Sequence, residues 1–434
     1  MKVALFTPWP PQRSGIADYA YRLAEGLRDQ NVQVEVFTDS ASPTPLNDCA
    51  IHPMNAESVA RLPDDALPVF QLGNNVAFHA LQPAALSRLG GLVHLHDPVL
   101  HHFHVDRTLA AGEGGYWNDL EFWYGSAIAG ACRRLLALGA PPWSNAAATA
   151  IPMFEPYLQF ADAVLVHSQS ALRAINKRMP VLRGYCVPQC YPTSPPRPRA
   201  RRPSSDALRL GVFGWVEPHK RIDQILAAMA ELRHSGVDLR LEVCGLPGAA
   251  SNKLVAQIGA LGLSSAVRLR GHLEHEAFIA EIAAVDVCIN LRDPTMGETS
   301  AVVTQALQLG TPVIVSDTGW YSELPDFVLK VPTGPDAVNA LVTHLGRLHS
   351  DRELLHSLAE STRRYALTEL DFDATIARYA EIIVTLGDER SRHRLIEDAL
   401  YRDVATAIAD LDLSGSSRDR EMTAGLLRTL SPCF

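Results

Sequence analysis

The sequence lacks the features that mark several specialised classes of protein. Only 20% of its 434 residues are charged, against a usual share of about 25%, and 47% are hydrophobic, which excludes an intrinsically disordered chain. No apolar run approaches the roughly 18 residues needed to span a bilayer. The first residues carry too short an apolar run for a signal peptide. We therefore expect a folded cytoplasmic protein.

Cysteine pairs, excess positive charge and nucleotide fingerprints are also missing. The seven cysteines are scattered and odd in number, unlike a disulfide framework. The formal net charge is −9, and affinity for nucleic acid rests mainly on Lys and Arg, so we expect no nucleic-acid partner. No GxGxxG follows a predicted strand and no GxxxxGK[ST] occurs, which argues against a dehydrogenase or a P-loop protein.

What the sequence does contain is a regular alternation of short apolar runs and helical periodicities. A strand-like run at 3–7 is followed by Ile16, Ala20, Leu23 and Leu27 at helical spacing, and by a second run at 32–37. A strand–helix–strand start predicts a parallel sheet covered by helices. Further strands are predicted at 69–72, 92–96, 163–166, 210–213, 239–244, 267–269, 285–290 and 312–315, with a helix at 222–232.

A proline-rich segment at 188–206, with four arginines, divides these elements into two series and is typical of a solvated linker. We therefore predict the α/β class, with two Rossmann-like doubly wound domains facing across a cleft. The predicted units are an N-terminal acceptor-side domain (1–195), a linker (196–206), a C-terminal nucleotide-sugar-binding domain (207–370), a helix packing back toward the N-terminal domain (371–390) and a helical extension (391–434).

Several short motifs follow the predicted strands. In Pro10–Tyr19, PPQRSGIADY, Gly15 stands at a predicted helix N-terminus, where free backbone amides can face an anion. The other motifs are VFQLGNN at 69–75, LHD at 95–97, ADAVLVHS at 161–168, GWVEPHKR at 214–221, PTMGETS at 294–300, GTPVIVSD at 310–317 and SELP at 322–325.

In their order and spacing these motifs resemble the retaining glycosyltransferases of family 4, of the group 1 type, over about residues 1–386. The resemblance implies the GT-B fold and a hexosyltransferase-like enzyme of polysaccharide biosynthesis. It implies a UDP- or GDP-sugar as substrate, no bound cofactor and no protein-bound metal. The acceptor would be a saccharide, a glycolipid or a small glycoside. Some related enzymes dock on membranes, so peripheral membrane contact is part of the expectation.

The resemblance also assigns roles to individual residues. His96 would contact the transferred sugar, Lys220 would hold the diphosphate, and Gly15 would close on the phosphates from the opposite domain. No protein nucleophile is implied, because a leaving phosphate oxygen takes the acceptor proton in a front-face displacement. The implied residues are His96, Lys220 and Glu298 for catalysis, Gly15, Lys220, Arg221, Glu298, Thr299, Ser300 and Gln305 for the donor, and Asp18, Tyr19, Asn74 and Asp97 on the acceptor side.

Two departures from the family pattern leave alternatives open. Trp215 stands where an arginine is usual, so one phosphate-pairing cation is lost unless Arg221 substitutes. Two glutamates eight residues apart are usual, whereas Glu298 and Gln305 are seven apart, on one helix face. These departures motivate two other hypotheses, a non-catalytic nucleotide-sugar-binding subunit and a sugar-nucleotide epimerase or hydrolase of the same fold.

Histidines and aromatic residues form two further clusters. The alternation of side chains along a strand puts His94 and His96 on one face, which invites a metal-site interpretation with Asp97. No second cluster supplies the remaining ligands, so we favour a sugar-contacting His96 and expect no metal. The aromatic residues at 116–124 could stack on an acceptor sugar, but their helical spacing favours core packing.

Overall fold

The structure, a computed structural model, describes residues 1–110, 112, 115–145, 147–193, 207–246, 248 and 250–410. The linker predicted at 196–206 lies outside these residues, as does the part of the predicted extension from 411 to 434. None of the described helices combines the length and the apolar composition needed to cross a bilayer. The domain limits predicted from the sequence remain our proposal. Below, the first domain means the unit around the N-terminal sheet, and the second domain means the unit around the C-terminal sheet.

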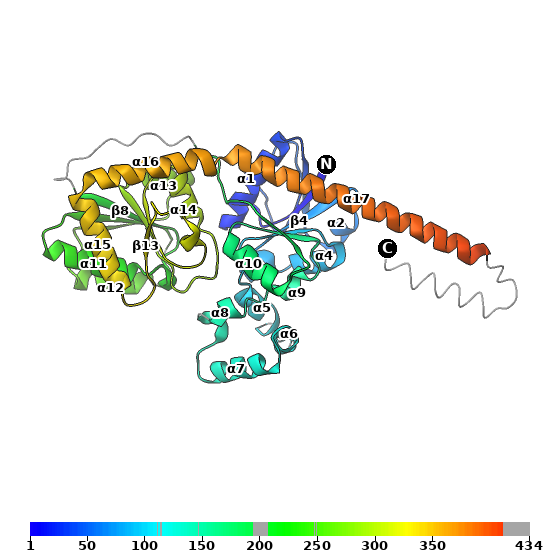
Figure 1. Ribbon diagram of the computed structural model, residues 1–434, viewed down its shortest axis with the longest axis horizontal. Coiled ribbons are helices and arrows are strands. Elements are labelled where there is room, and N and C mark those ends of the chain that lie inside the picture. Colours follow the sequence, from blue (N-terminus) through cyan, green and yellow to red (C-terminus); the bar gives the residue numbers. More distant parts are fainter. Residues whose placement is uncertain are drawn as a thin grey trace.

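The first domain is built on a seven-stranded parallel sheet with the order β3-β2-β1-β4-β5-β6-β7 (Figure 1). Its central strands are buried along their whole length, which explains why they appear as continuous apolar runs. The strands are β1 (Lys2–Phe6), β2 (Gln33–Thr38), β3 (Ala50–Pro53), β4 (Ala66–Leu72), β5 (Leu92–Leu95), β6 (Ala163–Val166) and β7 (Arg183–Cys186). The helices are α1 (Gly15–Asp29), α2 (Ala56–Ala60), α3 (Val76–His79), α4 (Gln82–Leu89), α5 (His101–Thr108), α6 (Gly115–Tyr124), α7 (Ser126–Ala137), η1 (Pro142–Ser144), α8 (Ala147–Ala150), α9 (Glu155–Leu158) and α10 (Gln169–Arg178).

The second domain repeats the plan with six parallel strands in the order β10-β9-β8-β11-β12-β13. In both sheets the strand order reverses beside the first strand, β1 or β8, so that later strands are added on its other side. This is the doubly wound arrangement, and the predicted α/β class is confirmed. The strands are β8 (Leu208–Phe213), β9 (Leu239–Cys244), β10 (Val267–Gly271), β11 (Val287–Asn290), β12 (Val313–Ser316) and β13 (Leu329–Val331). The helices are η2 (Pro218–Lys220), α11 (Ile222–His234), α12 (Ser251–Ala260), α13 (His275–Ala284), α14 (Ala301–Gln308), η3 (Gly319–Glu323), α15 (Ala337–Ser350) and α16 (Arg352–Glu369).

Three strands, β3, β7 and β13, have no counterpart in the sequence prediction. Each is an edge strand of its sheet and is only partly buried, so it gives a weaker apolar signal than a central strand. The strand predicted at 285–290 begins later, at Val287, because Val285 closes the preceding helix α13.

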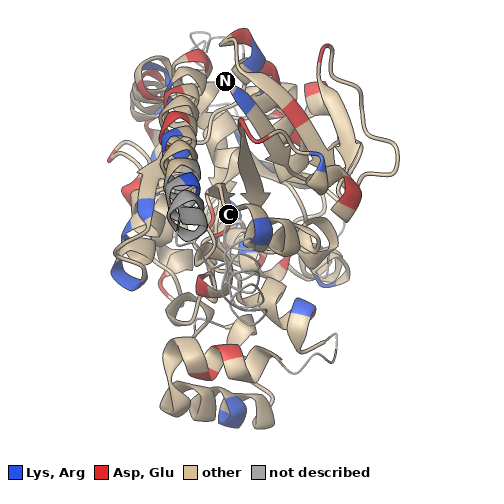
Figure 2. Cartoon of the chain, turned by 90° about the vertical axis from the view of Figure 1, so that its right-hand side faces the viewer, with Lys and Arg blue, Asp and Glu red and all other residues tan. Residues whose placement is uncertain are grey.

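The last described helix, α17 (Phe372–Asp410), leaves the second domain and crosses the first (Figure 1). It contacts α1 and β4, and Ile376, Tyr379 and Ile383 belong to the hydrophobic core of the first domain. A Cβ on Gly26 would lie 2.8 Å from Cγ1 of Ile376, so a glycine in α1 admits this close approach. Acidic and basic residues are interspersed along the exposed side of α17 (Figure 2).

Helices α5 to α8 form a small unit below the first sheet (Figure 1). Its core includes Tyr116, Leu120 and Met153, so the predicted core packing of the aromatic stretch holds for Tyr116. Phe122, in the same helix, is instead 77% exposed.

Candidate active site

A cavity of about 790 Å³ lies between the two domains. Gly214 and Gly245 line it directly after the C-terminal ends of β8 and β9, which is where open parallel sheets bind ligands. Gly15, at the start of α1, faces them from the first domain. Residues from both domains thus share one cleft, and its other lining residues include Arg13, Asp18, Arg22, Trp215, His275, Ala301 and Gln305.

Lys220 lies buried at the edge of this cleft. It is 7% exposed, and its Nζ donates a hydrogen bond to the Phe213 carbonyl at 2.7 Å. A Cβ on Gly214 would lie 2.6 Å from Nζ, so a side chain at this position would displace the ammonium from its present place. Burial, together with the nearby positive charge of Arg292, lowers the pKa of Lys220 to about 7. Within the described part of the chain, no carboxylate forms an ion pair with Lys220, which leaves its charge available to an anionic ligand.

Arg292 is the functional candidate that the sequence analysis missed. It follows β11 by two residues, is 9% exposed, and donates from Nε to Oε1 of Glu298 at 2.9 Å. Its positive charge contributes to lowering the pKa values of both Lys220 and His219. The available signal was its position, because an arginine just after the C-terminal end of a buried strand reaches the ligand-binding edge of the sheet.

Glu298 organises the loop that precedes α14. Its Oε2 accepts the backbone N–H of Met296 at 2.8 Å and the hydroxyl of Thr295 at 3.1 Å. The Ser300 hydroxyl accepts the N–H of Val303 at 3.3 Å and caps the helix. The loop therefore directs the N-terminus of α14 toward the cleft, where Ala301 is a lining residue.

The same loop touches the first domain. Gly297 has a φ of 79°, and a Cβ there would lie 2.6 Å from Cγ of Pro98. The Thr299 hydroxyl donates to Oε1 of Gln189 at 3.1 Å. The 294–300 loop thus meets the segment that follows β5 and contains His96.

His96 and Asp97 follow β5, and both side chains form hydrogen bonds with residues of the first domain. His96 Nε2 lies 2.6 Å from Oε1 of Gln71. Oδ2 of Asp97 accepts the N–H of Asn74 at 2.8 Å. Burial raises the pKa of Asp97 to about 6, and the negative charge of Glu298 acts in the same direction.

Comparison with known proteins identifies the fold. Residues 199–365 match the family model described as Glycosyl transferases group 1. Sucrose-phosphate synthase from Thermosynechococcus elongatus superposes with a TM-score of 0.61 at 18% identity, covering 89% of this chain and 99% of that one. Anabaena HepE in complex with UDP and glucose gives a TM-score of 0.59 at 17% identity, covering 89% of this chain and 100% of HepE. The fold is GT-B.

A third GT-B structure, that of WaaG, a glycosyltransferase involved in lipopolysaccharide biosynthesis, gives a TM-score of 0.57 at 16% identity, covering 88% of this chain and 99% of WaaG. Among curated protein sequences none matches this chain. The GT-B prediction is therefore confirmed, and the family match supports glycosyl transfer of the group 1 type.

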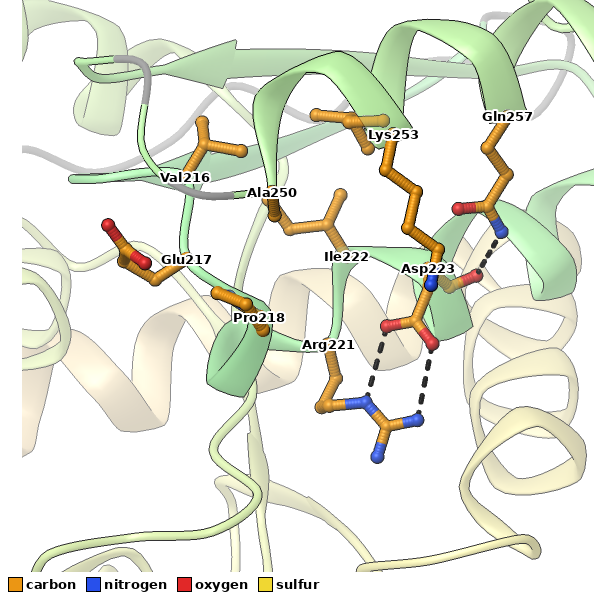
Figure 3. Close-up of a pocket in the computed structure, with 10 residues that line it drawn as sticks. Val216, Glu217, Pro218, Arg221, Ile222, Asp223, Ala250, Lys253 and Gln257 are labelled. Carbon is orange, nitrogen blue, oxygen red and sulfur yellow. Dashed lines mark hydrogen bonds and ion pairs between the residues drawn. The ribbon is translucent and has the colours of Figure 1, made fainter. Parts of the chain in front are cut away.

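Within the GT-B cleft, the predicted donor residues fall into two groups. Gly15 and Gln305 line the cleft from opposite domains. Lys220 lies behind the lining residue Gly214, and Ser300 caps the helix that begins at the lining residue Ala301, whereas Glu298 contacts Arg292 and its own loop. Arg221 lies elsewhere. It lines a smaller pocket of about 270 Å³, with Val216, Glu217, Pro218, Ile222, Asp223, Ala250, Lys253, Leu254 and Gln257 (Figure 3).

The guanidinium of Arg221 is turned toward carboxylates rather than toward the cleft. It donates to Asp223 from Nε at 3.2 Å and to Asp293 from Nη1 at 3.0 Å. The sequence prediction offered Arg221 as a substitute for the arginine missing at Trp215. The structure instead brings Arg292 beside Lys220, while Trp215 is a half-exposed lining residue.

The residues predicted on the acceptor side also separate. Asp18 is exposed and lines the cleft. Tyr19 is buried, with its ring edge against His94, His96 and His167, and does not line the cleft. Asn74 is held in its loop by Asp97 and accepts the Phe103 N–H at 2.9 Å. Tyr19 therefore packs against the His96 ring, and Asn74 bonds Asp97, the residue that follows His96.

The structure adds His167 to the predicted pair of His94 and His96. One nitrogen from each ring lies within 4.8 Å of the other two, and all three side chains are buried. His167 follows β6, the neighbour of β5, so its position after a predicted strand was the signal that could have found it. Histidine clusters of this size can hold a metal. Here, within the described residues, Nδ1 of His96 is the only one of their ring nitrogens without a hydrogen-bond partner.

Proposed function

We propose that this protein is a retaining glycosyltransferase that moves a sugar from a nucleoside diphosphate sugar, UDP- or GDP-linked, to an acceptor bound by the first domain. The observation that carries the proposal is Lys220, a buried cation without a carboxylate partner in the described chain, at the cleft edge of β8. The group 1 family match over 199–365 supports it. UDP and glucose bound to HepE support a nucleotide sugar as donor.

In this proposal the second domain stabilises the leaving diphosphate. Lys220 and Arg292 supply positive charge, and the first amides of α14 supply free N–H donors at the positive end of a helix dipole. Such fixed charges favour the transition state because negative charge develops on the leaving phosphate oxygen. Glu298 orients Arg292 through its ion pair and holds the loop that presents α14.

The transfer itself needs no protein nucleophile. The bond between the anomeric carbon and the phosphate oxygen breaks, and the acceptor oxygen bonds to the same carbon on the same face of the sugar. The acceptor proton passes to the departing phosphate oxygen, so charge and atoms balance. His96 contacts the sugar, Gln305 contacts the ribose, and closure of the cleft brings Gly15 onto the phosphates.

The acceptor is proposed to be a saccharide, a glycolipid or a small glycoside, and the place of reaction the cytoplasm, with peripheral membrane contact. The α6–α7 unit carries the apolar side chains that such contact needs, since Phe122 is 77% and Leu138 80% exposed. Sedimentation with anionic vesicles tests this contact, and a double change of both residues to serine abolishes it. Equal sedimentation of the two proteins argues against membrane docking by this surface.

A thermal-shift screen over UDP-, GDP-, ADP- and dTDP-sugars is the most direct test of the donor. A ligand that binds only the folded state raises the unfolding midpoint. We expect a UDP- or GDP-sugar to stabilise the wild type and Lys253→Ala, but not Lys220→Ala. Lys253 is the matched control because it is an exposed lysine of the smaller pocket. A folded Lys220→Ala variant with near-normal turnover overturns the role of Lys220.

Product analysis separates the proposal from its alternatives. Transfer makes a larger glycoside, hydrolysis makes free sugar, and epimerisation changes the sugar of the donor. A non-catalytic subunit binds the nucleotide sugar without consuming it in the presence of saccharide, glycolipid and small-glycoside acceptors.

A further inference from the structure

A continuous hydrogen-bonded chain of side chains runs from His96, directly after β5, into the core of the first domain. His96 Nε2 lies 2.6 Å from Oε1 of Gln71, and the Gln71 amide lies 3.3 Å from the Tyr379 hydroxyl. That hydroxyl lies 3.2 Å from Nδ1 of His94, and His94 Nε2 lies 3.0 Å from Nε2 of His167. The chain ends at a hydrogen bond of 2.9 Å between Nδ1 of His167 and the Val187 carbonyl.

The carbonyl end fixes the direction of every link. A carbonyl oxygen only accepts, so His167 carries its proton on Nδ1, and its Nε2 accepts. His94 therefore donates from Nε2, which makes its Nδ1 an acceptor. The Tyr379 hydroxyl donates to that nitrogen and in turn accepts from the Gln71 amide. The Gln71 carbonyl oxygen then faces His96.

This reasoning holds for neutral histidines, and the surroundings favour the neutral form. His94, Gln71 and Tyr379 are fully buried. Burial lowers the pKa of His167 to about 4, and burial also lowers the pKa values of His94 and His96. With one proton per link, both ring nitrogens of His94 and of His167 have a hydrogen-bond partner, and a bound metal would disrupt these bonds.

We propose that Gln71, Tyr379, His94 and His167 are positioning residues that hold His96 in the tautomer with its proton on Nε2. Nδ1 of His96 is then left as a lone-pair acceptor. A sugar hydroxyl would donate to it. The role of His96 toward sugar rests on the proposed function, whereas the direction of the chain does not.

The hydrogen bonds of Tyr379 join parts of the polypeptide that lie far apart in the sequence. Tyr379 lies in α17, 285 residues after His94 and 308 residues after Gln71 in the sequence. The helix that enters from the second domain thus supplies the link that carries the proton pattern from His94 to Gln71 and His96. The Tyr379 hydroxyl can be removed without changing a residue of either sheet.

Neutron diffraction from crystals of the perdeuterated protein tests the direction of the chain without any variant. We expect deuterium on Nε2 of His94 and His96 and on Nδ1 of His167, with no metal between the rings. Deuterium on Nδ1 of His96 or of His94, or a metal ion bound by the three rings, overturns the inference.

Kinetics of Tyr379→Phe test its consequence. Without the hydroxyl the Gln71 amide is free to turn, so His96 no longer holds one tautomer, and we expect kcat to fall about tenfold. The KM for the nucleotide sugar changes less, because Lys220, Arg292 and the N-terminus of α14, which are proposed to hold the diphosphate, lie in the second domain. Thr375→Val is the matched control, since it removes a buried hydroxyl one turn earlier in α17 that bonds Cys190 and Asp371. An unchanged kcat in Tyr379→Phe, or an equal loss in Thr375→Val, contradicts a positioning role.

The two proposals fail separately. If the deuterium positions are as derived but the protein transfers no sugar, the proposed function fails and the chain stands. If the protein transfers sugar and His96 carries deuterium on Nδ1, the positioning inference fails and the proposed function stands.

Discussion

The carboxylate of Glu323 in the second domain accepts the backbone N–H of Gln169 in the first domain at 2.9 Å. It also accepts the N–H of Ser170 and an N–H of the Arg173 guanidinium. Gln169 and Ser170 are the first residues of α10, whose early amides have no partner within the helix. A negative charge from one domain therefore satisfies the positive end of a helix in the other.

Replacing Glu323 with alanine should loosen this interdomain contact. The variant loses a charge-assisted helix cap, so we expect the protein to be destabilised by about 1 kcal/mol. The unfolding midpoint in a thermal scan measures the loss. Arg173→Ala is the control, because it removes only a mostly exposed ion pair and should change the midpoint little. Equal midpoints for Glu323→Ala and the wild type contradict the cap.

The buried ammonium of Lys220 should make stability depend on pH. Its pKa of about 7 in the folded chain lies below the ordinary 10.5, so between these pH values the unfolded chain binds more protons. Stability from this group therefore rises as the pH rises from 7 to 10.5, and the full burial cost is present below pH 7. We expect Lys220→Met to be more stable than the wild type at pH 7 by about 2 kcal/mol.

This difference should close as the pH approaches 10. Unfolding midpoints of both proteins from pH 6 to 10 measure it, without nucleotide sugar. Lys253→Met, a change of an exposed lysine, should track the wild type at every pH. A difference that does not vary with pH argues that Lys220 keeps an ordinary pKa.

Arg292 and Arg221 can be compared directly as phosphate-binding residues. Loss of a charge-assisted contact from a buried site typically costs about 1.5–3 kcal/mol, so Arg292→Met should weaken UDP binding at least tenfold. Arg221→Met should weaken it less, because its guanidinium is paired with Asp223 and Asp293. Isothermal titration calorimetry with UDP measures both. The reverse order assigns the phosphate contact to Arg221.

Gly297 should tolerate no side chain. Its φ of 79° disfavours other residues, and the added Cβ of Gly297→Ala would collide with Pro98 across the domain contact. Displacing the loop by a fraction of an ångström moves the N-terminus of α14, so we expect kcat/KM to fall by roughly 10- to 100-fold. Gly236→Ala is the control, since it has a similar φ of 83° but open space around it. Comparable losses in both variants attribute the effect to backbone strain alone.

The sequence predicted those parts of the fold that are dictated locally. β6 coincides with a predicted strand because its continuous apolar run matches a strand buried on both faces. β9 coincides with another because its buried apolar residues alternate with Arg240 and Glu242. Gln305 lines the cleft and Lys220 is buried behind Gly214, while their roles toward the donor stay a prediction. Arg292 escaped prediction because its importance comes from Lys220, which lies 72 residues earlier and meets it only in the folded chain.

The partners of His96 escaped for the same physical reason. His94 was visible at a spacing of two from His96, but His167 follows the neighbouring strand, β6, and Tyr379 lies in α17, 285 residues after His94 in the sequence. A hydrogen bond between such residues leaves no periodic signal. Only the order of the strands and the path of α17 bring them together.

The path of α17 also bears on how the chain is made. Ile376, Tyr379, Ile383 and Leu386 complete the hydrophobic core of the first domain. During synthesis this part of the first domain's core therefore stays exposed to water until more than 380 residues have left the ribosome. A protein cut before Phe372 would leave the surface of α1 at Gly26 without its contact to Ile376, so the first domain depends on α17 to complete its core.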